Sequence, residues 1–436
     1  MKATDVLRSR AFAVGAFVAA LLAAVTVVRA QDGPLPEEPP RGAAVADPSA
    51  PAPPMAIKAL KIIPVVGDPI DHGVILIRNG KIEAVGKASE VKIPKGYIVK
   101  EFPKGWVTPG WVDLHCHVAG TDLNDMVYPT NPELRNLDAI VPDNWQLQAA
   151  RQGGVTTMLF IPGSGTNLSG FGTLVKTAGK TVDEMLVRFP GAMKIAQLGN
   201  PERRAGDVGR TRMGMNYLLR ERLAEAKKYA ESWKHSATDS SAKPPQKDER
   251  LENFRGLFRR DFPVIVHTVW VNGIEATKRL LHDELGLDVI ITHATFDSYK
   301  AADVIVEAEL PVNVGPRMIH YERETGRILG LSKVWKDAGA DLSINTDCPV
   351  IPAEELTTQA AVSVHHGLDE KSALEALTIR PAEQMRMGDR LGSLEKGKDA
   401  DIVIRNGPPL DARSAVLYVL VNGKVAFDRK KDKIWF

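Results

Sequence analysis

The chain has 436 residues, with 56 Lys and Arg against 54 Asp and Glu, and only two Cys. Its length is about three times an ordinary domain of ~150 residues, so it accommodates one large domain with additions. A net charge of +2 is too balanced for a protein that binds the nucleic-acid backbone, and two cysteines exclude a disulfide framework or a Cys-rich zinc module. The 44% of hydrophobic residues is typical of a globular protein and excludes a mostly disordered chain.

The first part of the chain has the order of an export signal. Lys2, Arg8 and Arg10 precede the apolar run 11–28, which ends beside small residues. This order predicts a signal peptide in residues 1–30. The run of about 18 residues is also near the lower limit for a membrane span, so an uncleaved N-terminal anchor is the alternative. In both cases we expect the folded part to be periplasmic or secreted, with membrane contact only through an uncleaved leader.

The next segment and the two ends of the remaining chain predict a linker and a β domain. Residues 31–55 are rich in Pro and Ala, which predicts an extended linker. The Asn-Gly pairs 79–80 and 422–423 each lie between apolar, strand-like runs, as in hairpins with type I′ turns. Because both ends share this pattern, we expect one small β-sandwich built from residues 56–108 and 388–436.

Between these ends, strand-like runs alternate with helical stretches, which indicates parallel βα units. Eight such runs are what a (β/α)₈ barrel of the TIM type needs, and residues 109–387 are expected to form it. The hydrophilic interval 234–250 is expected to be a surface insertion or a loop between helices. The expected strands are 106–118, 155–161, 173–176, 193–198, 264–269, 289–293, 312–314 and 341–345.

Potential metal ligands lie at the ends of several expected barrel strands. His115 and His117 are two positions apart, so on a strand their side chains point to the same face. His267 and His293 end two further strands, and Asp347 follows another. Active sites of this fold lie at the carboxyl ends of the strands, and zinc accepts imidazole and carboxylate ligands. We therefore predict that these five residues form a metal site, with zinc favoured and other divalent metals as alternatives.

These residues lie in motifs that resemble the amidohydrolase superfamily, and in particular its secreted imidazolonepropionase-related and Xaa-Pro-dipeptidase-related branch. The resemblance extends from about residue 56 to the C-terminal end. It implies that His115, His117, His267 and His293 are metal ligands and that Asp347 is both a ligand and a proton shuttle. The motifs that carry it are Pro109-Gly110-Trp111-Val112-Asp113-Leu114-His115-Cys116-His117, the strand ends at His267 and His293, Thr346-Asp347-Cys348-Pro349, and the tail Leu391-Gly392-Ser393-Leu394-Glu395-Lys396-Gly397-Lys398-Asp399-Ala400-Asp401.

The chemistry of this residue set favours hydrolysis. A bound divalent metal lowers the pKa of its water to about 7, which provides a nucleophile at neutral pH. Asp347 beside that water can take its proton and deliver it to a departing amine nitrogen. A nucleophilic serine fits worse, because the sequence has no Gly-x-Ser-x-Gly motif. We therefore predict an amidohydrolase that cleaves an amide, cyclic amide or dipeptide C–N bond in a small substrate.

The sequence departs from its relatives at the fourth strand. Binuclear relatives bridge two metals there with a carboxylated Lys or a Glu, and similar sequences carry a Glu before the Asn-Pro pair where this chain has Gly199. Lys194 is the candidate bridge, although the pattern places it near the start of its strand. Glu202 is expected in an exposed loop. We therefore expect one metal ion, with a weakly held second ion as the alternative.

Several residues near the expected barrel mouth are candidates for substrate binding. Arg203, Arg204, Arg210 and Arg212 follow the fourth strand and can bind a substrate carboxylate bidentately, or else serve as solvated loop residues. His320 follows the seventh strand and is a candidate to line the mouth.

The two cysteines lie beside expected ligands, on the first and eighth strands, which are neighbours in a closed barrel. A disulfide between Cys116 and Cys348 is one alternative in an oxidising compartment, and we expect two free buried thiols instead.

Two functional classes fit these observations. The first is a metal-dependent hydrolase, which the set of five potential ligands favours. Deamination with the same activated water is a variant of this class. The second is a non-catalytic or impaired barrel that acts as an extracytoplasmic binding protein, which the absence of a Glu at Gly199 favours.

Overall fold

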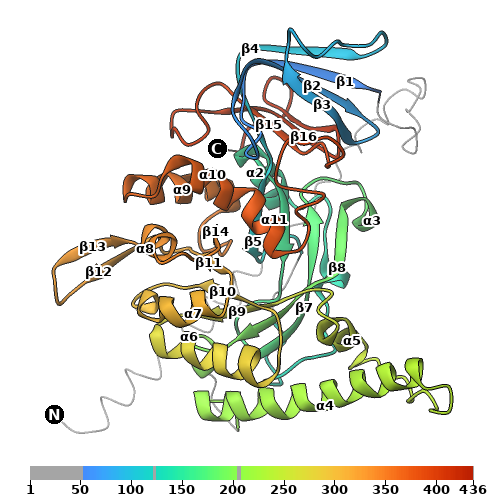
Figure 1. Ribbon diagram of the computed structural model, residues 1–436, viewed down its shortest axis with the longest axis vertical. Helices are drawn as coiled ribbons and strands as arrows, with labels where there is room; N and C mark the ends of the chain where they lie inside the picture. The colour runs from blue at the N-terminus through green and yellow to red at the C-terminus, as the bar shows by residue number, and fades with distance from the viewer. Residues whose placement is uncertain (1–52, 121–123, 204–207, 436) are drawn as a thin grey trace, which may run out of the picture. The chain divides into compact units, whose positions relative to one another are not determined.

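The computed structural model describes residues 53–120, 124–203 and 208–435 (Figure 1). The expected leader, the linker up to residue 52, and Arg204 lie outside the described residues, as does the side chain of Arg203. Within the described part of the chain, the search for a helix long and apolar enough to span a bilayer found none.

One seven-stranded sheet combines the two ends of the described chain, where the sequence predicts a small β-sandwich from the same two segments. Its strand order is β17-β16-β15-β4-β1-β2-β3, and antiparallel pairing of β15 with β4 joins the N-terminal and C-terminal parts. Its apolar side chains form a core of their own, which includes Ile57 and Ile404. The strands are β1 (Met55–Ile62), β2 (Ile70–Arg78), β3 (Lys81–Lys87), β4 (Ile98–Pro109), β15 (Ile402–Arg405), β16 (Val416–Val421) and β17 (Lys424–Asp428).

The two Asn-Gly pairs form the predicted tight turns. Asn79 and Gly80 have φ of 51° and 76°, and Asn422 and Gly423 have φ of 49° and 71°, as a type I′ turn requires at both central residues. A Cβ atom placed on Gly80 would stand 2.9 Å from the carbonyl oxygen of Asn422, so the two turns lie against each other. The similar turns of the two chain ends therefore meet in one domain.

The second sheet is a nearly closed eight-stranded barrel in the order β14-β11-β10-β9-β8-β7-β6-β5 (Figure 1). A parallel bridge between Cys116 and Cys348 brings the end of β5 beside the segment that follows β14. The predicted α/β barrel with a small β domain is therefore confirmed. Its strands are β5 (Trp111–Cys116), β6 (Val155–Phe160), β7 (Leu168–Lys176), β8 (Leu186–Ala196), β9 (Val264–Thr268), β10 (Val289–His293), β11 (Val312–Val314) and β14 (Leu342–Ile344).

One barrel strand has the opposite direction to the one that the sequence predicts. β7, which contains the expected parallel strand 173–176, is antiparallel to both β6 and β8. Only residues 161–167 connect β6 to β7. A parallel crossover needs a dozen or more residues, usually with a helix, so this short connection allows only an antiparallel return.

Helices cover the outside of the barrel, and the longest, α4, carries the start of the hydrophilic interval 234–250 (Figure 1). The remainder of that interval is a surface connection to α5, as expected. The α-helices are α2 (Trp145–Gly153), α3 (Val182–Met185), α4 (Arg212–Thr238), α5 (Glu252–Phe258), α6 (Val271–Thr277), α7 (Ala302–Glu307), α8 (Leu331–Asp337), α9 (Leu356–His365), α10 (Glu370–Leu377) and α11 (Ile379–Gln384). Shorter helical turns are η1 (Asn136–Ala139), η2 (Pro201–Arg203), η3 (Lys278–Glu284), η4 (Ser298–Ala301) and η5 (Ala353–Glu355), and β12 (Ile319–Glu322) pairs with β13 (Arg327–Gly330) in a separate hairpin.

A buried ion cluster links the barrel to the β domain. Lys176, at the end of β7, has a side chain only 1% exposed and forms ion pairs with Asp399, at 2.9 Å, and with Asp401. Both carboxylates precede β15 and are themselves at most 9% exposed. Burying such charges is favourable only while they remain paired.

Substitution of Lys176 therefore has a large expected cost in stability. We expect Lys176→Met to lower the free energy of unfolding by about 3–5 kcal/mol, because it removes the ion-pair partner of the buried Asp401 carboxylate, whereas Asp399 keeps its ion pairs with Lys81 and Arg390. Urea denaturation at neutral pH measures this change, and Lys180→Met, at an exposed position near the same strand, serves as the control. A loss no larger than that of the control would show that the cluster does not stabilise the fold.

Candidate metal centre

Four predicted histidine ligands come together at the carboxyl ends of the barrel strands. His115 lies on β5 and His117 just beyond it, while His267 and His293 lie on β9 and β10. The ring centroids are 5.1 Å apart for His115 and His117, 4.5 Å for His115 and His293, and 4.4 Å for His267 and His293. The structure thus brings together residues that are up to 178 positions apart in the sequence.

Asp347, three residues beyond β14, completes this cluster. Its Oδ1 atom lies 3.4 Å from Nε2 of His115 and 3.3 Å from Nε2 of His117. One potential ligand atom from each of His115, His293 and Asp347 falls within 4.8 Å of the others. Asp347 and His293 also have positive φ values, 51° and 72°, a backbone conformation that non-glycine residues adopt mainly where the surrounding structure holds them.

Hydrogen bonds to main-chain carbonyls orient two of the rings. Nδ1 of His117 lies 2.9 Å from the carbonyl oxygen of Ile161, and Nδ1 of His293 lies 2.8 Å from that of Gly315. A carbonyl oxygen only accepts, so in both rings Nδ1 carries the hydrogen and the lone pair is on Nε2. Nε2 of His117 therefore faces a carboxylate oxygen of Asp347, and these two atoms are the ones that a cation at this site would meet.

The donor set fits a divalent cation. Nδ1 of His115, Nδ1 of His267 and Nε2 of His293 are buried and have no hydrogen-bond partner among the described residues. Burial lowers the pKa of all three rings, so at neutral pH they are uncharged and present free lone pairs. Buried polar atoms are normally paired, and neutral imidazole with a carboxylate is a typical zinc set. This site therefore suits the metal that the sequence predicts.

The carboxylate of the cluster is ionised. Burial acts to raise the pKa of Asp347, but the adjacent His293 and His117 side chains outweigh it and lower the pKa below its ordinary value. A negatively charged Asp347 beside imidazole rings gives the cluster the charge that a cation needs.

Lys194 lies inside this cluster, which corrects its expected position near the start of a strand. β8 runs from Leu186 to Ala196 rather than over the expected residues 193–198, so Lys194 is two residues from the carboxyl end of the strand. Its side chain is fully buried, and Nζ lies 2.9 Å from Nε2 of His115. Burial lowers the pKa of Lys194 to about 7, so a substantial fraction is a neutral amine near neutral pH.

Gly199 and Glu202 adjoin the site on its β9 side. A Cβ atom on Gly199 would stand 3.8 Å from Nε2 of His267, so this position, where the family resemblance leads us to expect a Glu, faces the cluster. Glu202 is half-buried rather than exposed. It accepts a hydrogen bond from the main-chain nitrogen of Gly199 at 3.2 Å and forms an ion pair with Arg212 at 3.3 Å.

The candidate substrate-binding residues occupy different surroundings. Arg212 begins α4 and its guanidinium is engaged by Glu202. His320 lies on β12, half-buried, with its ring 6.1 Å from that of Tyr299, and makes no ring contact with the histidine cluster. Arg203 and Arg204 have no described side chains.

Asp113 contacts two segments of the site, although the sequence analysis assigned it no role. Its carboxylate accepts hydrogen bonds from the main-chain nitrogen of His115 at 3.0 Å and from the hydroxyl of Thr346 at 2.5 Å. These bonds tie the end of β5 to the segment that carries Asp347. Burial raises the pKa of Asp113 to about 7. Its spacing of two from His115 was the available signal, since alternation places both on one face.

The two cysteines are free and buried, as expected. They face each other across the parallel bridge that closes the barrel, and their neighbours in the chain are His115, His117 and Asp347.

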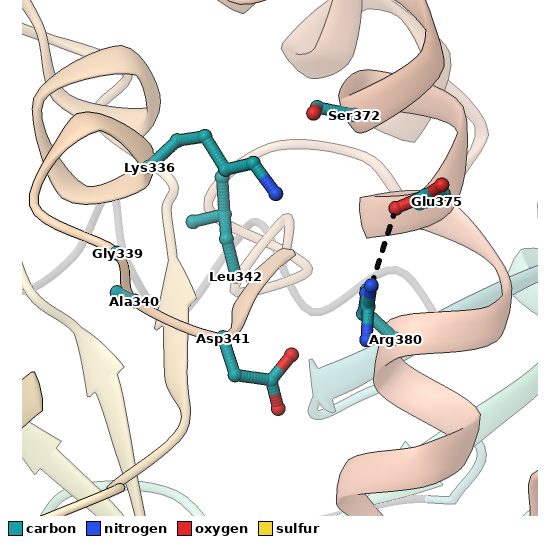
Figure 2. Close-up of a pocket in the computed structure, with 8 residues that line it drawn as sticks. All are labelled: Lys336, Gly339, Ala340, Asp341, Leu342, Ser372, Glu375 and Arg380. Carbon is teal, nitrogen blue, oxygen red and sulfur yellow. Dashed lines mark hydrogen bonds and ion pairs between the residues drawn. The ribbon is translucent and has the colours of Figure 1, made fainter.

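A separate cavity of about 220 Å³ lies at the opposite end of β14. Figure 2 shows Asp341 and Leu342 on one side of it and the ion pair of Glu375 with Arg380, 3.5 Å long, on the other. Asp341 precedes β14, whereas Asp347 follows it. Because barrels of this kind carry their active sites at the carboxyl ends of the strands, this cavity is not the candidate site.

Comparisons with known proteins agree with the architecture. Residues 106–427 match the family model described as the Amidohydrolase family. Amidohydrolase tasK of Hapsidospora irregularis is 27% identical over 395 residues, which are 82% of this chain but only 40% of that relative. This chain therefore spans less than half the length of the curated relative.

Solved structures show the same fold. A crystal structure of an amidohydrolase from Thermotoga maritima MSB8 is 29% identical, with a TM-score of 0.78 over 86% of this chain and 100% of that one. A Xaa-Pro dipeptidase crystallised with methionine in its active site is 16% identical, with a TM-score of 0.54 over 85% and 99% of the two chains, and shows the fold alone. With the family model covering most of its length, this chain belongs to the Amidohydrolase family, whose members hydrolyse C–N bonds.

Proposed function

We propose that this protein is a zinc-dependent hydrolase that cleaves an amide C–N bond in a small-molecule or short peptide substrate. The observation that carries the proposal is the convergence of His115, His293 and Asp347, with ligand atoms within 4.8 Å of one another and buried ring nitrogens that lack other partners. Membership in the Amidohydrolase family supports the reaction class. The other two histidines, His117 and His267, complete the set.

A divalent metal bound at this site would lower the pKa of a water molecule to about 7 and polarise the scissile carbonyl. Asp347 accepts the proton of the attacking water, because its carboxylate is ionised and lies at the centre of the cluster. The same carboxyl group then donates that proton to the amine nitrogen as the C–N bond breaks.

The other residues of the chain keep the site in position for this proton transfer. The carbonyl groups of Ile161 and Gly315 hold His117 and His293 in one tautomer, with Nε2 directed inward. Asp113 ties the β5 end to Thr346, the residue before Asp347, which limits movement of the proton-accepting carboxylate.

Lys194 decides how many ions the site holds. One zinc ion is favoured, because the chain has no Glu at Gly199 to serve as a bridge. A second ion becomes possible once the neutral amine of Lys194 adds to carbon dioxide and releases a proton, which gives a carbamate with oxygen ligands. The buried position of Lys194, 2.9 Å from Nε2 of His115, supports this role.

Metal analysis together with a substrate panel tests the proposal. We expect about one equivalent of zinc per chain, hydrolysis of some N-acyl amino acids, dipeptides or cyclic amides, and loss of that activity on chelation with recovery on adding zinc. Bicarbonate is expected to raise the zinc content toward two equivalents, and Lys194→Ala to abolish the increase. A zinc-loaded protein that hydrolyses no member of the panel would favour the binding-protein alternative, and release of ammonia from an aminated ring would favour a deaminase.

A further inference from the structure

Three side chains form a stack on neighbouring loops at the mouth of the barrel. Each lies near the carboxyl end of β9, β10 or β11, two or three positions after a residue that belongs to the metal centre or orients one of its ligands. The members of the stack are Trp270 after His267, Phe296 after His293, and Arg317 after Gly315, whose carbonyl orients His293. The stack therefore lies on the loops that border the candidate metal centre.

The contacts within the stack are close and ordered. The rings of Trp270 and Phe296 are stacked, with centroids 5.2 Å apart and an interplanar angle of 23°. The guanidinium carbon of Arg317 lies over the ring of Phe296, 5.0 Å from its centroid. An Arg over an aromatic face is attracted by the ring quadrupole, and its planar head keeps its N–H edge free for another partner.

The backbone holds the two aromatic residues in unfavourable conformations. Trp270 has φ of 56° with ψ of 151°, and Phe296 has φ of 61°. Such conformations cost about 1–3 kcal/mol each for non-glycine residues and cluster at functional sites. Burial does not explain the position of Trp270, since its side chain remains 40% exposed. The loops therefore present this aromatic surface to solvent beside the metal centre.

The charge of Arg317 has no counterpart in the described part of the chain. It is exposed and forms neither an ion pair nor a hydrogen bond with any described residue. Arg212, another candidate to bind an anionic group, is already paired with Glu202. A planar guanidinium with a free N–H edge binds a carboxylate bidentately.

We infer that Arg317, supported by Phe296 and Trp270, binds a carboxylate of the substrate and selects acylated amino acids or short peptides with a free carboxylate over their neutral analogues. This inference rests on the proposed hydrolase function and specifies its substrate class. Arg317 binds and orients the substrate, and Trp270 provides an apolar surface for the group beside the carboxylate.

Kinetics on matched substrates test the inference. The probes are N-acyl amino acids and dipeptides, each paired with its C-terminal carboxamide. We expect the carboxylate members to be preferred, and Arg317→Gln to raise their KM about 10- to 100-fold with kcat little changed and carboxamide hydrolysis unaffected. Arg317→Lys, which keeps the charge without the planar fork, is expected to lose part of the preference. Equal hydrolysis of both members, or a preference that Arg317→Gln leaves intact, would overturn the inference.

A control and a binding measurement separate this inference from the proposed function. Arg323→Gln removes the same charge from an exposed position in the turn between β12 and β13, and is expected to leave the preference intact. Titration calorimetry of the zinc-loaded protein with the same pairs measures binding without turnover. If no member is hydrolysed but the carboxylates bind and Arg317→Gln removes that binding, only the hydrolase proposal fails. If neither member of any pair binds, the carboxylate site is wrong.

Discussion

Asp347→Asn is expected to lower kcat by about 100- to 10,000-fold, the usual contribution of a positioned proton-transfer group. Asn keeps an oxygen at nearly the same place but cannot accept the proton of the attacking water. The fold should tolerate the change, because the side chain is similar in size and lies in a cluster with His115 and His117. Steady-state kinetics on a hydrolysed substrate of the panel, with zinc content determined in parallel, measure the effect.

Asp341→Asn is the matched control for this experiment. Asp341 flanks the same strand, β14, at its amino end, beside the cavity of Figure 2. Since the candidate centre lies at the carboxyl ends of the strands, we expect this variant to keep its kcat. Equal losses in both variants would point to a general effect on the barrel, and normal kcat in Asp347→Asn would exclude Asp347 as the proton acceptor.

Substitution of His293 is expected to have the second large effect. His293→Gln removes a ring whose Nε2 is buried without another partner and whose Nδ1 is bound to Gly315. Loss of an outer partner of a zinc ligand costs about 10- to 100-fold in metal affinity, so loss of a ligand should cost at least that. Competition with a zinc-binding dye measures the affinity, and activity at limiting zinc should fall with it.

His235→Gln is the control for this substitution. His235 lies on α4, its side chain is 67% exposed, and it is not one of the candidate ligands. We expect its zinc affinity and activity to match those of the parent protein. Thermal unfolding with and without zinc adds a second test, since a ligand that binds only the folded state raises Tm. A His293 variant that still binds zinc as tightly and is stabilised as much would remove His293 from the site.

Local patterns were sufficient for much of the fold and for the side chains that cluster at the carboxyl ends of the barrel strands. Asn79-Gly80 and Asn422-Gly423 predict their turns, because a type I′ turn depends on the φ values of two adjacent residues. His115, His267, His293 and Asp347 were recognisable because each lies at the end of an apolar run, and parallel barrel strands end at one face. Neither inference needed to know which strands are neighbours.

Two errors of the sequence prediction arose from strand boundaries and direction. Lys194 was placed near the start of its strand because the strand was expected at 193–198, whereas β8 runs from Leu186 to Ala196 and Lys194 lies close to its carboxyl end. The direction of β7 was wrong because apolar periodicity is the same for parallel and antiparallel strands. The short connection 161–167 was the available signal for it.

The sequence alone determined which residue types end the barrel strands, and hence the cluster of His115, His117, His267, His293 and Asp347. Only the tertiary structure decided that Lys194 reaches His115, that Asp113 binds Thr346, and that Arg317 lies over Phe296. The physical reason is that a barrel strand buried on both faces forms a continuous apolar run, and the sequence displays the end of such a run directly. Contacts between side chains on different strands and loops depend on barrel closure, strand register and loop conformation, which are set by packing across the whole domain.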